Sequence, residues 1–555
     1  MKISFKNKLL KSNPFSLCLV FAMLLMLIGR PAAANELQGP LPGQQSIKDI
    51  GTANPSLIFG SNPDDYFALN AGLITSQGDL SPPGTPGGVS AAQARTAFGV
   101  NGSGIKIGVI SDSFDKLGGL GTDITNGDLP VATTVVKDDL ASGRSDEGRA
   151  MAQIVHDLAP GAEIYFHSAF NNTPGQQSIA DAIDALVAQN VDIIVDDVFN
   201  LTEPFFQDGV VAQAVDNAYS AGIGYFSSAG NQSDESYEGI FSDSGGGIHD
   251  FKTGGGVDQF LNISVPNNRQ VRVAVEWDDP YLSVGAPGNA LDFDVGLWDF
   301  ATSTFVSTSL NDQQSGADPW EIVGAVNTSG VDKQYGLVIQ HDPADILLDP
   351  TGALLKAIKF DSGFIFDDDD TNSPTVVGHA AAEGAQAIAA MRYDGVTGGG
   401  PNLDIEWFSS QGGTQILFDT AGNPISDLRN TPQLTATDGV NTTFFGSDYE
   451  PDGWPNFFGT SAAAPHAAAV AALMLELAAD LGFSLSPDQI YSILQATALD
   501  IETAGFDYLS GFGLIDAFGS LDHVAAIPEP GTLILLGSGI LALFGYSRRR
   551  KNSAG

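Results

Sequence analysis

Short runs of β-branched residues alternate with amphipathic stretches of helical period between residues 104 and 228, and this alternation constrains the fold more than any other feature. Strands joined in sequence by helices require right-handed crossovers, which produce a parallel sheet covered by helices on both faces. The sequence therefore predicts an α/β fold. The expected strands are 105–110, 162–167, 191–195 and 223–227, and the expected helices are 147–158, 178–189 and 210–221.

The helical period disappears between residues 241 and 375, where strand-like alternation and turn-rich stretches replace it. We interpret this region as an inserted β-sandwich domain. Helical alternation is expected to resume at 378–390, and a long Ala-rich helix is expected at 461–479. One catalytic-type α/β domain in two parts, 96–240 and 376–523, explains this order better than three independent domains. The strands expected in the insertion include 270–277, 291–298 and 335–339.

The N-terminal end has the three parts of a secretory signal: basic residues, an apolar run from Phe15 to Ile28, and Ala32-Ala33-Ala34. We expect residues 1–34 to direct export and cleavage to occur near Ala34. A short membrane anchor or a buried helix is the alternative, but the run is too short to span a bilayer comfortably. Residues 35–95, rich in Gly, Pro, Ser and Gln, are predicted to be a propeptide or a linker.

The C-terminal end, residues 524–551, also has three parts: Ile527-Pro528-Glu529-Pro530-Gly531, an apolar run at 532–546, and four basic residues at 548–551. This pattern resembles the PEP-CTERM sorting signal. The resemblance implies transient inner-membrane association through segment 532–546, removal by an exosortase-type sorting enzyme, and release to the cell surface or extracellular matrix. A plain tail anchor is the alternative.

Charge and cysteine content exclude several classes of chemistry. The chain has 24 Lys and Arg against 66 Asp and Glu, a net charge of −42, which repels phosphate backbones, so no nucleic acid partner is expected. The one cysteine, Cys18, lies inside the N-terminal apolar run, so the exported protein would have neither a disulfide nor a thiolate nucleophile. Lipid attachment at Cys18 is disfavoured because it lies in the middle of that run.

The most specific stretch is Gly459-Thr460-Ser461-Ala462-Ala463-Ala464-Pro465-His466, at the start of the expected long helix. A serine there places its hydroxyl at a helix N-terminus, where the dipole favours developing negative charge. The alternative is that Ser461 is only an N-cap. Asp112 follows the strand expected at 105–110, at the strand end where active sites of α/β sheets gather.

These residues resemble the motifs of the subtilisin-like serine peptidases. The nucleophile motif is Gly-Thr-Ser-x-x-x-Pro-His, Ile107–Ser113 resembles the strand that ends in the catalytic Asp, and Ser228-Ala229-Gly230-Asn231 resembles the oxyanion segment; Phe408–Gly412 matches a further stretch. The resemblance implies a secreted serine endopeptidase acting on protein or peptide substrates. Ser461 would be the nucleophile, Asn231 the oxyanion donor and Asp112 the orienting carboxylate. Asn231 as an ordinary turn residue is the alternative.

The general base departs from that family, because Glu147 occupies the position of the family's histidine. A glutamate base resembles the sedolisins, but their supporting Asp corresponds to Met151 here, and their oxyanion Asp corresponds to Asn231. Asp112 would then support Glu147 directly. His156, at the far end of the same predicted helix, and His466, within the nucleophile motif, are expected to be structural.

Two carboxylates within hydrogen-bond reach share one proton and titrate as a coupled pair. Glu147 accepts a proton only when ionised, so we expect a pH optimum below neutrality, with activity falling once the shared proton is lost. Asp196 and Asp197 follow a predicted strand; they would bind the substrate amine, join the proton-sharing group, or be solvated charges. Both are left outside the catalytic set. Asp146 is expected to be a first-turn helix charge.

No cofactor is expected to be required, although the insertion offers oxygen ligands for calcium. Asp292 and Asp294 lie on one face of a predicted strand in a domain that resembles the β-sandwiches accompanying secreted bacterial peptidases, and Asp367–Asp370 form an acidic run. Two other functions stay open. The chain would be a catalytically inactive binding scaffold, or a matrix protein that uses the β-sandwich for adhesion.

Overall fold

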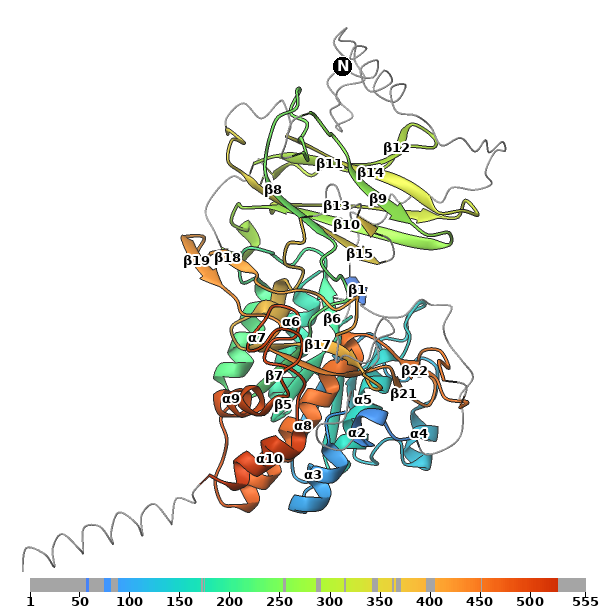
Figure 1. Cartoon of the computed structure of the whole chain (residues 1–555), viewed down its shortest axis with the longest axis vertical. Helices are drawn as coiled ribbons and strands as arrows, with labels where there is room; N and C mark the ends of the chain where they lie inside the picture. Colours follow the sequence, from blue (N-terminus) through green and yellow to red (C-terminus); the bar gives the residue numbers. More distant parts are fainter. Residues whose placement is uncertain are drawn as a thin grey trace, which may run out of the picture.

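The computed structural model describes residues 56–58, 74–80, 88–170, 173, 175–252, 256–285, 291–313, 316–341, 348–361, 364–365, 371–395, 405–450 and 452–527 (Figure 1). The predicted signal peptide, most of the predicted propeptide, the sorting segment from residue 528 onward and the acidic run Asp367–Asp370 lie outside the described residues.

A seven-stranded sheet forms the centre of the α/β domain, and every neighbouring pair of strands in it is parallel. This is the architecture that the alternation of strands and helices predicts. In spatial order the strands are β20 (Leu434–Asp438), β17 (Ala385–Arg392), β7 (Gly224–Ser228), β5 (Ile193–Asp196), β2 (Lys106–Ser111), β4 (Glu163–Ser168) and β3 (Thr134–Lys137).

Helices cover both faces of the sheet, because side chains of successive strand residues point to opposite faces. Ile107 and Val109 of β2 pack into the core beneath one set of helices, and Ile110 packs into the core beneath the other. The first set is α3 (Ala91–Phe98), α5 (Glu147–Leu158), α8 (Thr460–Asp480), α9 (Pro487–Thr497) and α10 (Ala517–Ala525). The second set is α6 (Gln177–Ala188) and α7 (Val210–Ser220).

The prediction of helix at 378–390 is wrong. The structure has a short 3-10 helix, η5 (Gly378–Ala381), followed by strand β17 (Ala385–Arg392). The Ala-rich composition favours helix, but β17 lies between β7 and β20, and small residues fit beneath α8 on that face. Tertiary position therefore overrides local propensity here.

The insertion consists of two antiparallel sheets packed over a hydrophobic core that includes Val273, Trp277, Phe293 and Leu337. Its first strand begins at Ser236 and its last ends at Ile365. One sheet has the order β13 (Trp320–Asn327), β10 (Arg269–Trp277), β15 (Leu354–Asp361) and β8 (Ser236–Ile240). The other has the order β12 (Thr304–Ser309), β11 (Phe293–Asp299), β14 (Lys333–His341), β9 (Leu261–Val265) and β16 (Phe364–Ile365), and η3 (Leu282–Val284) follows β10.

Short elements complete the α/β domain. Strand β6 (Val198–Asn200) follows β5 and pairs antiparallel with β1 (Ser56–Ile58), so Leu57 lies opposite Phe199. The others are α2 (Gln77–Leu80), α4 (Leu120–Asn126), the hairpin β18 (Gln415–Phe418) and β19 (Pro424–Leu428), and the pair β21 (Val440–Asn441) and β22 (Asn456–Phe457).

The segment at Ile74–Leu80 is joined to the α/β domain by hydrogen bonds. The Ser76 backbone N–H donates to Asp157 at 2.7 Å, and the Ser76 hydroxyl pairs with His466 Nε2 at 2.9 Å. Within the described ranges, α8 is the one helix long and apolar enough to cross a membrane, and most of it is buried in the domain core.

Candidate active site

Three neighbouring strands of the parallel sheet lead into Asp112 and Asn231, which the sequence predicts to carry chemistry, and Asp197, which it left outside the catalytic set. Asp112 directly follows β2, Asp197 directly follows β5, and Asn231 comes three residues after β7. Because the carboxyl ends of parallel strands meet at one edge of a sheet, these side chains lie along the same edge. Helices α5 and α8 begin at this edge, with Glu147 and Ser461 in their first turns.

The Asp112 carboxylate is buried and is surrounded by hydrogen-bond donors. It accepts from the backbone N–H groups of Ser113 and Ser145 and from the Ser145 hydroxyl, the last at 2.7 Å. Its Oδ1 also accepts from the backbone N–H of Glu147 at 3.1 Å, so it holds the first residue of α5 through the main chain. Burial raises the pKa of Asp112 to about 6, although the Ser145 and Ser113 donors oppose the shift.

Glu147 and Asp197 are fully buried carboxyl groups that interact with each other. Burial raises the pKa of Glu147 well above its usual value, and the charges of Asp197 and Asp112 raise it further, whereas the Ser461 hydroxyl lowers it. Burial likewise raises the pKa of Asp197, against a hydrogen bond from the Ser111 hydroxyl at 3.1 Å. Among the described residues, neither Glu147 oxygen has a hydrogen-bond partner of ordinary geometry, although the Ser461 hydroxyl and the Asp197 carboxyl both interact with this side chain.

Asn231 is fixed beside the nucleophile by the residue that precedes Ser461. Its Oδ1 accepts from the Thr460 backbone N–H at 3.0 Å and from the Thr460 hydroxyl at 2.9 Å. Because a main-chain N–H is always a donor, these bonds identify the oxygen of the Asn231 amide and direct its Nδ2 donor elsewhere. The structure thus brings Asn231, Ser461, Glu147 and Asp112 together at one edge of the sheet.

Two glycines allow the helices to approach this edge. Gly459, the N-cap of α8, has a φ of 120°, and a Cβ there would lie 3.3 Å from Asn231 Nδ2. Gly148 directly follows Glu147, and a Cβ there would lie 2.3 Å from a ring carbon of Phe166. A larger residue at either position would move a catalytic helix away from the sheet.

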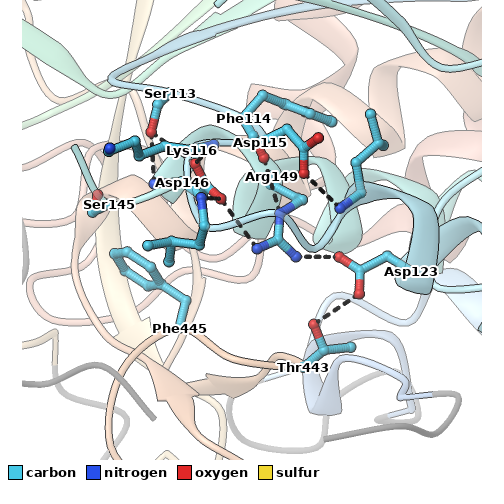
Figure 2. Close-up of polar contacts among 12 residues, drawn as sticks. Ser113, Phe114, Asp115, Lys116, Asp123, Ser145, Asp146, Arg149, Thr443 and Phe445 are labelled. Atoms are coloured by element: carbon cyan, nitrogen blue, oxygen red, sulfur yellow. Dashed lines mark hydrogen bonds and ion pairs between the residues drawn. The ribbon is translucent and has the colours of Figure 1, made fainter. Parts of the chain in front are cut away.

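Asp146 is a buried residue with a left-handed backbone, φ 61°, and not the solvated first-turn charge expected from the sequence. Figure 2 shows its carboxylate among donors from the loop that follows Asp112. It accepts from the Ser113 hydroxyl at 2.9 Å and from the backbone N–H groups of Lys116 and Leu117 at 2.7 and 2.9 Å. The residue before Glu147 therefore connects helix α5 to that loop.

Arg149 occupies the centre of the same network (Figure 2). Its guanidinium is fully buried, pairs with Asp123, lies 3.2 Å from Asp146, and donates from Nε to the Phe114 carbonyl at 2.9 Å. It also lies 3.7 Å from the centre of the Phe444 ring. These contacts of the Arg149 guanidinium hold helix α5 in place two residues after Glu147.

Asp196 is buried, so the alternative of a solvated charge is wrong for it as well as for Asp197. Its carboxylate accepts from the Tyr225 hydroxyl and from the Ser227 hydroxyl, and lies 3.3 Å from His379 Nε2. His379 Nδ1 lies 2.7 Å from Glu203, and the charges of Glu203 and Asp196 outweigh burial and raise the pKa of His379 well above its usual value. The Asp196 carboxylate therefore has hydrogen-bond and ion-pair partners within this buried cluster.

The two histidines considered from the sequence lie outside the catalytic contacts. His466 Nδ1 pairs with the Ala462 carbonyl at 2.8 Å, and burial lowers the pKa of His466 to about 4, so it is a neutral structural residue. His156 lies in the last turn of α5.

The residue that the sequence analysis left outside the catalytic set is Asp197. Its position directly after a central strand, the same position as that of Asp112, is the signal that would have identified it.

Within the described ranges, no group of three or more His, Cys, Asp or Glu side chains is placed to hold a metal ion. Asp292 and Asp294 are both buried in the insertion, at the start of β11.

The Asn231 geometry leads to a specific prediction. Asn231→Ala is expected to lower kcat by about 10²–10³-fold, the usual loss for one oxyanion donor, with little change in KM. Steady-state kinetics on a peptide amide would measure both constants. Gln232→Ala, which alters the adjacent side chain, is the matched control. A loss confined to KM, or an equal loss in the control, would contradict the role of the amide.

Comparisons with known proteins identify a family and a sorting motif. The subtilase family model matches residues 130–513, more than half of the chain, including Glu147, Asn231 and Ser461 but not Asp112. The PEP-CTERM protein-sorting motif matches residues 526–551. No curated protein matches the chain significantly.

The chain is also similar to solved protease structures. For the Clostridium perfringens CspB protease the identity is 11% and the TM-score 0.49, covering 79% of this chain and 98% of that chain. For a lanthipeptide protease the identity is 14% and the TM-score 0.39, covering 82% of this chain and 99% of that chain.

Proposed function

The chain belongs to the subtilase family, and from this premise we propose that it is an exported serine endopeptidase with a glutamate as general base, in the manner of the sedolisins. The observation that carries the proposal is the placement of the buried Glu147 carboxyl against the Ser461 hydroxyl, at the N-terminus of α8 and beside the Asn231 amide.

In the proposed reaction, Glu147 takes the proton of the Ser461 hydroxyl while Oγ attacks the carbonyl carbon of the scissile peptide bond. The negative charge that develops on the carbonyl oxygen is stabilised by Asn231 Nδ2 and the N-terminus of α8. Breaking the C–N bond transfers the proton from Glu147 to the leaving amine and leaves an ester on Ser461. Water then hydrolyses the ester with Glu147 again as base.

Asp197 is proposed to share a proton with Glu147. Two adjacent buried carboxyls cannot both ionise cheaply, so the pair holds one proton. Their hydrogen bond raises the pKa of Glu147 and lowers that of Asp197, and catalysis requires the state in which the proton has moved to Asp197 and Glu147 is ionised. Asp112 holds Glu147 by its backbone N–H and stabilises the first turn of α5.

This arrangement predicts a bell-shaped pH profile. When all of these carboxyls are protonated Glu147 cannot act as a base, so activity is expected to rise with pH as Glu147 ionises, above the usual pH range of a glutamate because burial raises its pKa. It falls when the last shared proton is lost and three adjacent charges repel each other. We expect an optimum on the acid side of neutrality, with kcat/KM at least about fivefold lower at pH 4 and at pH 9. Equal rates at pH 5 and pH 9 would contradict the shared proton.

A fluorophosphonate probe tests the function directly. Labelling of the full chain across pH 4 to 8, located by mass spectrometry, should occur at Ser461 and disappear in Ser461→Ala. Labelling that follows the pH profile of peptide cleavage supports the peptidase. Absence of labelling and cleavage at every pH, both before and after limited proteolysis of the N-terminal segment, would overturn it.

The C-terminal sorting motif indicates export to the cell envelope or surface. We propose that an exosortase-type enzyme is the partner that removes this segment, after transient inner-membrane association, and that the N-terminal signal is cleaved near Ala34. Protein or peptide chains outside the cell would then be the substrates.

One observation favours a second function, an inactive binding scaffold of the same fold. Neither Ser461 nor Glu147 has any exposed surface in the whole chain. A scaffold would leave Ser461 unlabelled even after limited proteolysis of the N-terminal segment, whereas the peptidase would become labelled.

A further inference from the structure

A further buried carboxyl lies at the sheet edge that carries the candidate active site, and the reaction proposed above does not use it. Asp438 is the last residue of the edge strand β20, and its side chain has no exposed surface. Its Oδ2 accepts a hydrogen bond from the backbone N–H of Gly459 at 2.9 Å. Among the described residues its Oδ1 has no hydrogen-bond partner, so the Gly459 N–H is the group that this carboxyl holds.

The backbone brings these two residues together through a short antiparallel pair. β21 begins two residues after Asp438, and β22 ends two residues before Gly459. The two strands lie side by side, with Val440 opposite Phe457 (Figure 1). A main-chain bond from the Gly439 N–H to the Phe457 carbonyl, at 2.8 Å, extends this contact toward the sheet edge. The Asp438 side chain therefore closes the end of the pair that leads into α8.

The turn before Ser461 is held from two sides. Gly459 has a φ of 120°, and its carbonyl accepts from the Ala462 N–H at 2.9 Å, which begins α8. Asp438 holds this turn from β20, and Asn231 holds the Thr460 N–H from the segment after β7. Because β17 lies between β20 and β7, the two contacts are separated by a whole strand. Loss of one contact would leave the turn free to rotate about the other.

The Asp438 carboxyl is expected to be neutral in the folded protein. Burial raises the pKa of Asp438 well above its usual value, and the charge of Glu406 raises it further, whereas the Gly459 N–H and the charge of Arg392 oppose the shift. Burial also raises the pKa of Glu406 to about 7. Arg392 is paired with Asp394 at 2.7 Å, so its charge is already balanced. A neutral carboxyl accepts from an N–H through its carbonyl oxygen, as the amide of asparagine also does.

We propose that Asp438 is a positioning residue for the nucleophile: it holds the Gly459 N–H and thereby fixes the turn that places the Ser461 hydroxyl against Glu147. The inference rests on the proposed peptidase function and extends it to a residue outside the active-site contacts. Asp438 acts on the main chain alone, so its loss should slow the chemical step and leave substrate binding unchanged. Misplacing a reacting group by about 1 Å can cost about 10²-fold in rate.

The test compares Asp438→Ala with Asp438→Asn in the full chain, before and after limited proteolysis of the N-terminal segment. Alanine removes the acceptor, so kcat on a peptide amide and the rate constant for fluorophosphonate labelling of Ser461 should fall about 10–100-fold at pH 6, with KM changed less than about twofold. Asparagine keeps an oxygen acceptor in a neutral side chain of nearly the same shape, so both rates should stay within about threefold of wild type. The labelling rate constant does not depend on the folded fraction, so a destabilised variant stays informative.

Asp216→Ala is the matched control, because Asp216 of α7 also accepts from a glycine N–H, that of Gly384 at 2.8 Å, but lies outside the active site. Wild-type rates in Asp438→Ala, an equal loss in Asp438→Asn, or an equal loss in Asp216→Ala would overturn the inference.

Hydrogen–deuterium exchange gives a readout that needs no activity. Peptides covering residues 456–463 should exchange faster in Asp438→Ala than in wild type, and at the wild-type rate in Asp438→Asn. Unchanged exchange in the alanine variant would overturn the inference while Ser461 of the wild-type chain still reacts with the fluorophosphonate. The expected exchange pattern together with an unlabelled wild-type Ser461 would instead overturn the peptidase function, and with it the catalytic role of this contact.

Discussion

Glu147→Gln is expected to lower kcat/KM by about 10²–10⁴-fold, the usual contribution of general base catalysis. Glutamine has nearly the same shape and can still accept a hydrogen bond from the Ser461 hydroxyl, but it cannot take the proton. Because Glu147 is fully buried and its raised pKa already favours the neutral form, the substitution should leave the fold intact. Steady-state kinetics near pH 6, with circular dichroism as a check on folding, would measure the effect.

Two further variants sharpen this prediction. Glu163→Gln, in β4 and half-buried outside the site, should retain wild-type activity. Asp197→Asn supplies a neutral partner that has no proton to lose, so the basic limb of the pH profile should move to higher pH while the catalytic base remains. Wild-type rates in Glu147→Gln would exclude the glutamate as the base, and an unmoved basic limb in Asp197→Asn would exclude the shared proton.

Arg149→Met is expected to reduce the free energy of unfolding by about 3–5 kcal/mol, because removing one partner of a buried ion pair leaves uncompensated charge. Asp123 and Asp146 both lie on the guanidinium, and all three side chains are essentially inaccessible to solvent. Methionine fills much of the same volume, so the loss should come from charge and hydrogen bonding and not from a cavity. Urea unfolding followed by circular dichroism would measure it.

Arg144→Met is the matched control for this variant. Arg144 pairs with Asp139 at 2.6 Å, but both side chains keep about a fifth of their surface exposed, so the expected loss is below about 1 kcal/mol. A loss of that size in Arg149→Met would mean that the network does not support the first turn of α5. The double variant Arg149→Met with Asp123→Asn should recover part of the lost stability.

The α/β architecture could be predicted because its signals are local. The strand that ends at Ser111 is a short run of β-branched residues, the helix Glu147–Leu158 is amphipathic, and the long helix from Thr460 is a continuous Ala-rich run. Because active sites of α/β sheets gather at the carboxyl ends of the strands, Asp112 and Asn231 could be expected at one edge of the sheet. Glu147, at the position of the family's histidine, can be read directly from the sequence.

The parts of the fold and of the candidate site that could not be predicted depend on contacts between segments distant in the sequence. Strand β17 resembles a helix because alanine favours helix, and only its neighbours β7 and β20 make it a strand. The Asp146 and Arg149 network joins residues from α4, α5 and the loop at Thr443, and no spacing in sequence indicates it. The role of Asp197 depends on which strands are adjacent in space, and β5 lies next to β2 although two strands and three helices separate them along the chain.

Among the described strands, β6 pairs with β1 alone, and β1 comes from the N-terminal part of the same chain. An external polypeptide that adds to this edge must first displace Ser56–Ile58. Because β1 belongs to the same chain, its effective concentration at β6 is high and does not depend on the protein concentration. Access of other polypeptides to β6 would thus depend on how often β1 dissociates from it, and a single cut between residues 58 and 88 would allow β1 to diffuse away.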